Sequence, residues 1–161
     1  AQFSLNQLAA EVVELYRLQD PALSIRLELD PQLPEIEADR GRVRQILANL
    51  LSNSIEVLAG AGNGVITVRT RWLTTGKSAQ AEITVSDNGP GFREDILRKA
   101  FEPYVTSKAR GTGLGLAIVQ RIVEEHGGRI SAENLPGGGA RVRALLPAAM
   151  EKRTELRRER A

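Results

Sequence analysis

The sequence of residues 39–58 is DRGRVRQILANLLSNSIEVL, a long amphipathic segment in a chain of 161 residues. Its apolar side chains recur three and four residues apart, which places them on one face of an α-helix. That face comprises Val43, Ile46, Leu47, Leu50, Leu51, Ser54 and Leu58. A separate polar stripe comprises Arg42, Asn49, Asn53 and Glu56. We therefore predict a helix that buries one face in a core, ends at the glycines of residues 60–64, and carries a polar stripe beside the buried face.

Helices and strands alternate along the rest of the chain. Helical spacing predicts helices at residues 5–18 and 113–126, with a shorter one at 93–99. Alternation of apolar and polar residues predicts strands at residues 23–29, 65–73, 79–86, 129–134 and 140–146, with a short strand around Ile36. The last four of the longer strands form two hairpins, which are antiparallel. We predict an α/β (α+β) two-layer sandwich, with a mixed, mostly antiparallel sheet and helices on one face.

Composition narrows the classes of protein. Aromatic residues make up only 4% of the chain and cysteine is absent, so the core is aliphatic and disulfides and thiolate metal sites are excluded. No segment approaches the roughly 20 apolar residues that cross a bilayer. The net charge of the chain is +2, and residues 151–160, with five basic and three acidic residues, account for all of it. The rest of the chain is balanced in charge, which argues against a nucleic-acid groove. We expect one domain over residues 1–149 and a charged tail at 150–161, helical or disordered.

Two asparagines of the polar stripe, Asn49 and Asn53, lie four residues apart, so their amides point the same way. Asparagine is mildly unfavourable inside a helix, because it prefers caps and turns. A solvated polar face would explain the pair. The alternative is that their carbonyl oxygens face a hard cation with its attached phosphates and waters, and oxygen ligands of this kind suit magnesium.

A loop of turn-forming residues, Asp87-Asn88-Gly89-Pro90-Gly91, follows the predicted strand at 79–86. A surface turn would explain this composition. The alternative is that the strand end holds the Asp87 carboxylate where it can accept a hydrogen bond from an exocyclic amine, such as that of adenine. Gly89 and Gly91 would then let the backbone approach a flat ring closely.

Glycines open the helix predicted at 113–126, in the sequence Gly-Thr-Gly-Leu-Gly-Leu of residues 111–116. Each costs about 1 kcal/mol relative to alanine in a helix interior, so three together favour a function over a flexible hinge. A glycine-rich turn before a helix presents free N–H groups and the positive end of the helix dipole to a phosphate. Lys108 and Arg110 would supply cationic partners. The segment is neither a Walker A loop nor a Rossmann fingerprint, because the spacing differs from both.

In their order and spacing, Asn49–Asn53, Asp87–Gly91, Phe101-Glu102-Pro103-Tyr104 and residues 111–116 resemble the ATP-binding domain of bacterial sensor histidine kinases. That domain belongs to the superfamily that includes DNA gyrase B, the Hsp90 chaperones and the MutL repair proteins. The resemblance covers residues 3–148, and residues 101–116 look most like the nitrogen-regulation branch. It implies the Bergerat-type ATP-binding fold, with ATP and magnesium as cofactors, in a cytoplasmic domain of a membrane-anchored kinase.

The resemblance also implies an activity and partners. The domain would transfer a phosphoryl group from ATP to a histidine on a separate dimerisation and phosphoacceptor helix of the full-length kinase. A response regulator would receive it next. Asn53 matches the magnesium ligand of the family and Asp87 its adenine-binding carboxylate. Asn49 is the catalytic candidate, at a position where ATP-hydrolysing relatives carry a water-activating Glu. An amide can orient phosphate and water but cannot act as a general base.

The full set of ATP-binding candidates on this resemblance is Asn49, Asn53, Glu56, Asp87, Gly89, Gly91, Phe101, Lys108, Arg110, Gly111, Thr112, Gly113, Leu114, Gly115 and Leu116. Two positions depart from the pattern of the family. Val57 stands where an aromatic residue often covers the base, and Ala140 where a threonine often lies near adenine. We therefore expect modest ATP affinity.

His126 is the only histidine, and it precedes Gly127-Gly128 at a predicted helix end. A phosphoacceptor would be expected in a His-Glu-x-x-Asn/Thr-Pro-like helix, so we predict instead that His126 caps its helix. The domain should then bind ATP as a monomer without phosphorylating itself, with residues 92–112 as a lid ordered mainly by nucleotide. The alternatives are a serine protein kinase of the anti-sigma-factor type and a non-catalytic nucleotide-binding module.

Overall fold

The computed structural model describes residues 1–59, 62–76, 78–98 and 112–148. The helices of these segments are α1 (Leu5–Gln19), α2 (Arg40–Val57), α3 (Glu94–Arg98) and α4 (Thr112–Glu125). The strands are β1 (Gln2–Phe3), β2 (Ser24–Glu28), β3 (Ile36–Glu37), β4 (Val65–Thr75), β5 (Ser78–Asp87), β6 (Arg129–Asn134) and β7 (Ala140–Pro147). The predicted tail lies outside the described residues, as does most of the predicted lid.

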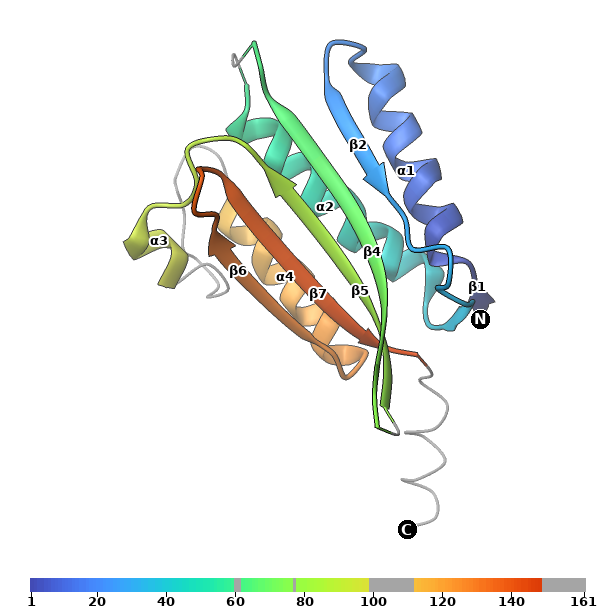
Figure 1. Cartoon of the computed structure of the whole chain (residues 1–161). Coiled ribbons are helices and arrows are strands. Elements are labelled where there is room, and N and C mark those ends of the chain that lie inside the picture. Colours follow the sequence, from blue (N-terminus) through green and yellow to red (C-terminus); the bar gives the residue numbers. More distant parts are fainter. Residues whose placement is uncertain (60–61, 77, 99–111, 149–161) are drawn as a thin grey trace.

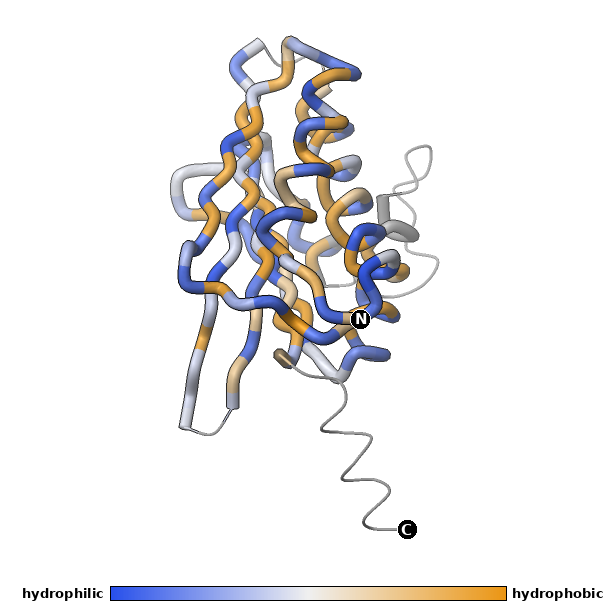
Figure 2. The backbone as a smooth tube through the Cα atoms, turned by 90° about the vertical axis from the view of Figure 1, so that its right-hand side faces the viewer, coloured by the Kyte–Doolittle hydropathy of each residue, from blue (hydrophilic) through white to orange (hydrophobic). Residues whose placement is uncertain are grey.

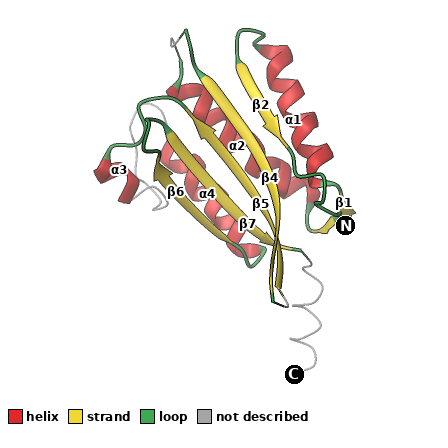
Figure 3. Ribbon diagram, viewed as in Figure 1, coloured by secondary structure: helices red, strands yellow, loops and turns green. Residues whose placement is uncertain are grey.

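Five strands form one twisted sheet in the order β2-β4-β5-β7-β6 (Figure 1). β2 runs parallel to β4, and the remaining neighbours are antiparallel. The helices α1, α2 and α4 lie on one face of this sheet (Figure 3). The predicted two-layer sandwich with a mixed, mostly antiparallel sheet is therefore confirmed. β1 was not predicted, and it pairs with β3 in a separate antiparallel ribbon.

The core lies between the two layers. Along the strands, hydrophobic and polar residues alternate, as the colours of the tube in Figure 2 show. α2 supplies the centre of the helical layer, because Val43, Ile46, Leu47, Leu50, Leu51 and Ser54 are all buried. Its first turn is capped by Asp39, whose carboxylate accepts a hydrogen bond of 3.1 Å from the backbone N–H of Arg42. Within the described segments no helix is both long and apolar enough to cross a membrane.

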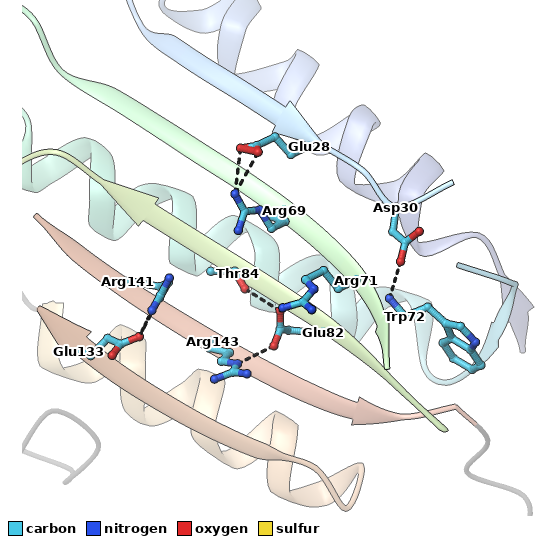
Figure 4. Close-up of polar contacts among 10 residues, drawn as sticks. All are labelled: Glu28, Asp30, Arg69, Arg71, Trp72, Glu82, Thr84, Glu133, Arg141 and Arg143. Atoms are coloured by element: carbon cyan, nitrogen blue, oxygen red, sulfur yellow. Dashed lines mark hydrogen bonds and ion pairs between the residues drawn. The ribbon is translucent and has the colours of Figure 1, made fainter. Parts of the chain in front are cut away.

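The other face of the sheet carries a set of arginine–glutamate pairs (Figure 4). Glu82 on β5 is only 2% exposed, yet it accepts a hydrogen bond of 2.5 Å from the Nε of Arg143. Nη1 of Arg71 lies 3.8 Å from the same carboxylate. Two arginines thus compensate one buried carboxylate, and removing either would leave charge poorly paired. This cluster joins β4, β5 and β7 across the sheet.

Candidate functional site

A row of side chains crosses the helix-facing side of the sheet at the end of β5. In the strand register Asp87 pairs with Ile66 of β4 and with Ala140 of β7, and Ala140 pairs in turn with Asn134 of β6. A pocket opens above this row, between the sheet, α2 and α4. It is lined by Leu50, Asn53, Ser54, Val57, Val85, Asp87, Gly91, Phe92, Leu116, Ala140 and Val142.

The carboxylate of Asp87 is the one acidic group among these lining residues, and it is only 8% exposed. Its Oδ1 accepts a hydrogen bond of 2.9 Å from the backbone N–H of Gly89. Its Oδ2 accepts one of 3.3 Å from the hydroxyl of Ser54 on α2. An ionised carboxylate has about four acceptor positions, so these two donors leave acceptor capacity. The pocket therefore pairs a mostly apolar wall with a fixed hydrogen-bond acceptor, as a binding site for a planar base requires.

The loop after Asp87 is tied down on both sides. The side chain of Asn88 accepts a hydrogen bond of 2.8 Å from the N–H of Val65 and donates one of 3.0 Å to the carbonyl of Asn63. A Cβ atom at Gly89 would lie 2.9 Å from Cγ1 of Val57. Gly91 has a φ of 82°, in the left-handed region that favours glycine. The backbone conformation therefore favours glycine at Gly91, and a side chain at Gly89 would require Val57 to shift.

Asn53 on α2 lines the pocket, whereas Asn49 lies one turn earlier on the same helix and is not among the lining residues. The side-chain nitrogen of each is buried and finds no hydrogen-bond partner among the described residues. Unpartnered buried amides are unfavourable by about 1–3 kcal/mol each, and native structures contain few of them. Either amide can satisfy itself with a phosphate oxygen through its N–H₂ group, or turn its oxygen to a metal-bound water. The two side chains therefore fit a phosphate-bearing ligand with an associated cation.

A metal ion would find few protein ligands here. In the part of the chain that the structure describes, no group of three or more His, Cys, Asp or Glu side chains could hold a metal. Magnesium does not need such a group, because it keeps several waters and binds through one or two protein oxygens plus substrate phosphates. The asparagine amides fit that form of binding.

The other candidates are distributed as follows. Leu116 on α4 is buried and lines the pocket. Val57 and Ala140, the two departures from the family pattern, also line the pocket. Glu56 is exposed and is not among the lining residues. Residues 112–115 form the first turn of α4, and nothing is described of their side chains. Phe101, Lys108, Arg110 and Gly111 lie outside the described residues.

Several lining residues were not predicted from the sequence. Ser54 was assigned to the buried face of α2, and Phe92 to the predicted lid, residues 92–112. A hydroxyl on an otherwise apolar helix face, directly after Asn53, is the one local signal that could have indicated Ser54. Val85 and Val142 reach the site only because β5 and β7 pair in register, with Val85 opposite Val142.

His126 caps α4, as predicted. It is only 4% exposed, and its Nδ1 lies 2.8 Å from the carbonyl oxygen of Ile122 in the last turn. Its Nε2 accepts a hydrogen bond of 3.3 Å from the backbone N–H of Asp39, the residue that caps α2. This pair of contacts requires the neutral ring with its proton on Nδ1. Both ring nitrogens are occupied inside the protein, which leaves neither free to accept a phosphoryl group.

Comparison with known proteins places this geometry in a family context. A family model described as histidine kinase-, DNA gyrase B- and HSP90-like ATPase matches residues 38–150. The sensor histidine kinase ZraS of Klebsiella oxytoca is 41% identical over 154 residues, which are 94% of this chain and 32% of that protein. The sensory histidine kinase/phosphatase NtrB of Vibrio alginolyticus is 35% identical over 143 residues, 84% of this chain and 41% of that protein.

A solved structure agrees with the sequence matches. The catalytic domain of the histidine kinase ThkA, in a nucleotide-free form, superimposes with a TM-score of 0.81 at 34% identity. The match covers 94% of this chain and 97% of that chain. The chain therefore spans less than half the length of the two curated relatives, but nearly the whole of an isolated catalytic domain.

Proposed function

This chain belongs to the family of histidine kinase-, DNA gyrase B- and HSP90-like ATPases and is a catalytic domain of the sensor histidine kinase type, and we propose that it binds magnesium-ATP and phosphorylates a histidine on a separate helix. The observation that carries this proposal is the pairing of two features. The buried Asp87 carboxylate lies in a mostly apolar pocket, and the side-chain nitrogens of Asn53 in the pocket wall and of Asn49 one turn earlier find no partner among the described residues. One feature suits a base, and the other suits phosphates.

The base would be adenine. Adenine presents an exocyclic amine, which donates to a carboxylate, whereas guanine presents a carbonyl oxygen at the same position. In the same ring orientation, a guanine oxygen would face Asp87 and place two acceptors against each other in a buried site, which is strongly unfavourable. The apolar residues Leu50, Val57 and Val142 then cover the faces and edges of the ring.

The phosphates would extend from this pocket along α2 toward the start of α4. Asn53 would hold magnesium through its side-chain oxygen and Asn49 would orient the terminal phosphate. Lys108, Arg110 and residues 111–116 would also bind the phosphates. Magnesium, when bound, would neutralise charge on the phosphate oxygens. Catalysis of this kind is mainly positioning and electrostatic stabilisation, and Asn49 cannot activate water as a general base, so little ATP would be lost to hydrolysis.

The acceptor must come from outside the described residues, because His126 has both ring nitrogens engaged. We propose that it is the phosphoacceptor helix of the same full-length kinase, and that a response regulator receives the phosphoryl group from it. The domain would be monomeric and would lie on the cytoplasmic side of a membrane-anchored sensor. Placement in the nitrogen-regulation branch stays a proposal, since ZraS matches with higher identity than NtrB.

The decisive experiment is phosphotransfer in trans. The domain is mixed with labelled ATP, magnesium and a two-helix fragment that carries the phosphoacceptor histidine of the same kinase. We expect acid-labile label on the fragment and none on the domain. Label that is acid-stable and appears only on a serine-bearing partner would indicate a serine kinase. Nucleotide binding with no transfer to either partner would indicate a non-catalytic module.

The role of magnesium has its own test. Calorimetric titration of wild-type protein with ATP should show a clear loss of affinity when magnesium is removed with a chelator. In Asn53→Ala the affinity in magnesium should fall to about the chelated value, because the metal has lost its protein oxygen. Asn53→Ala retaining the full magnesium dependence of the wild type would overturn the assignment of Asn53.

A further inference from the structure

The hairpin between β6 and β7 contacts both ends of the loop that follows Asp87. At one end, Gly139 lies so close to the Asp87 carbonyl that a Cβ atom there would be 2.0 Å from the oxygen. At the other end, Asn134 makes two hydrogen bonds to the backbone of Phe92. The Oδ1 of Asn134 accepts from the N–H of Phe92 at 2.8 Å, and its Nδ2 donates to the carbonyl of Phe92 at 2.8 Å.

The two bonds of Asn134 act as a side-chain substitute for a strand. An antiparallel partner would exchange one N–H and one C=O with Phe92, and the amide group supplies the same acceptor and donor. β6 is the last strand of the sheet, so no described strand lies beyond it to hold this segment. Gly91 completes the contact, because a Cβ atom there would lie 2.8 Å from the Oδ1 of Asn134.

Phe92 is the residue on which this contact acts. It is partly buried against the core and lines the same pocket as Asp87. α3 begins two residues later, at Glu94. The bonds to Asn134 therefore fix the position of Phe92 in the pocket wall. They also fix the backbone two residues before the start of α3.

We propose that Asn134 is a positioning residue of the nucleotide site, which holds Phe92 in the pocket wall through its paired hydrogen bonds. This inference rests on the proposed function, because the pocket must bind a nucleotide for the position of Phe92 to matter. Asn134 itself is exposed, at the end of an edge strand. Its loss should therefore disturb the pocket much more than the global stability of the domain.

The test compares Asn134→Ala and Asn134→Asp with Glu133→Gln, a control one residue earlier whose side chain pairs with Arg141 on the other face of the sheet. Three quantities are measured: the hydrogen exchange of the Phe92 amide by NMR, the affinities for ADP and ATP by calorimetry, and the melting temperature. Asn134→Ala should expose the Phe92 amide to exchange and weaken ADP and ATP by the same factor, about fivefold. We expect the same loss of affinity for ADP and ATP because Phe92 and Asp87 both line the part of the site that would bind the base.

Asn134→Asp should keep the Phe92 amide protected, since a carboxylate still accepts from it, but lose the donor to the Phe92 carbonyl. We expect its affinities to lie between those of Asn134→Ala and wild type, and all three variants to melt within a few degrees of wild type. The inference is overturned if Asn134→Ala binds ADP as wild type does, or if its lost affinity comes with a large fall in melting temperature. Wild-type protein that binds neither nucleotide would overturn the proposed function, and the inference with it.

Discussion

The hydroxyl of Ser54 on α2 donates a hydrogen bond of 3.3 Å to the Oδ2 of Asp87 at the end of β5, between residues 33 positions apart in the sequence. Both residues are buried. The bond joins the helical layer to the sheet inside the pocket, and together with the N–H of Gly89 it orients the carboxylate before any ligand arrives. Such preorganisation reduces the entropy lost on binding.

Substitutions at these two residues should weaken ATP binding to different degrees. Asp87→Asn removes the charged acceptor, and we expect a loss of about 10- to 100-fold in ATP affinity. Ser54→Ala removes only an orienting bond, so its loss should be about fivefold. Calorimetric titration measures both.

A matched control for Ser54→Ala is available on the same helix. The hydroxyl of Ser52 contacts the hydroxyl of Tyr16 on α1, 2.9 Å away, and Ser52 does not line the pocket. Ser52→Ala should therefore leave ATP affinity unchanged. Equal losses in the two serine variants would contradict a specific role for Ser54.

The parts of the fold that sequence could predict are those with long, regular patterns. α2 repeats its apolar residues over five turns, and β4 and β5 alternate over about ten residues each, so local spacing was sufficient. β1 has two residues, which is too short for any periodic signal. β2 pairs with β4 in parallel, with Ile25 opposite Ile66. The local sequence of neither strand predicts which strand it pairs with.

The site was predictable for residues whose chemistry is unusual in its local setting. Asparagines inside a helix are locally unfavourable, and a carboxylate next to two glycines follows the strand at 79–86. Asn53, Asp87 and Gly91 indeed converge on one pocket. Ser54 and Val142 are ordinary where they stand. They reach the pocket only through the packing of α2 on the sheet and the register of β7, which the sequence does not display.

Gly139 should be far less tolerant of substitution than its neighbour Gly137. A Cβ at Gly139 would lie 2.0 Å from the Asp87 carbonyl oxygen, and its φ of 103° is strained for any other residue. We expect Gly139→Ala to lower the free energy of unfolding by more than about 2 kcal/mol. A Cβ at Gly137 would meet nothing within 4 Å, so Gly137→Ala should change stability by less than about 0.5 kcal/mol.

Urea unfolding of both glycine variants makes this comparison, and ATP titration extends it to function. Because the contact is to the residue that carries the pocket carboxylate, Gly139→Ala should also weaken ATP binding in conditions where it is still folded. A Gly139→Ala protein as stable as Gly137→Ala would show that the hairpin does not fix the position of Asp87.

His126 should contribute to stability and not to chemistry. It connects the end of α4 to the start of α2 through its contacts with Ile122 and Asp39. His126→Ala should lower the free energy of unfolding by about 1–3 kcal/mol, because it removes a buried side chain and leaves the N–H of Asp39 without its partner. Glu125→Gln is the control, since it changes an exposed pair with Arg42 that is worth at most about 1 kcal/mol.

The same histidine variant tests the absence of self-phosphorylation. Incubation with labelled ATP should give no acid-labile label on wild-type protein or on His126→Ala, since the wild-type ring is buried with both nitrogens engaged. Label that appears on the wild type and disappears in the variant would make His126 an acceptor and contradict its structural role.

Asp30 should contribute to the loss of stability in acid. Its carboxylate accepts hydrogen bonds from the backbone N–H groups of Trp72 at 2.8 Å and of Gln32 at 3.0 Å (Figure 4 shows the first). The bond from Trp72, then the bond from Gln32, hold the pKa of Asp30 below its usual value, with a smaller contribution from the charge of Arg71 and against a small opposing effect of burial. Because the pKa is lower in the folded state, the unfolded chain takes up the proton first as pH falls.

The stability that Asp30 provides is therefore complete above the pKa of an ordinary Asp, about 4, and is lost as pH falls from there through the folded-state value. Asp30→Asn lacks this titration, so its stability relative to wild type should be lowest at neutral pH and should converge with wild type below about pH 4. Urea unfolding between pH 7 and pH 3 measures the difference. The exposed Asp95, which pairs with Arg93, serves as the control through Asp95→Asn. A constant difference between Asp30→Asn and wild type across that range would show that the two backbone bonds stabilise the carboxylate and the amide equally.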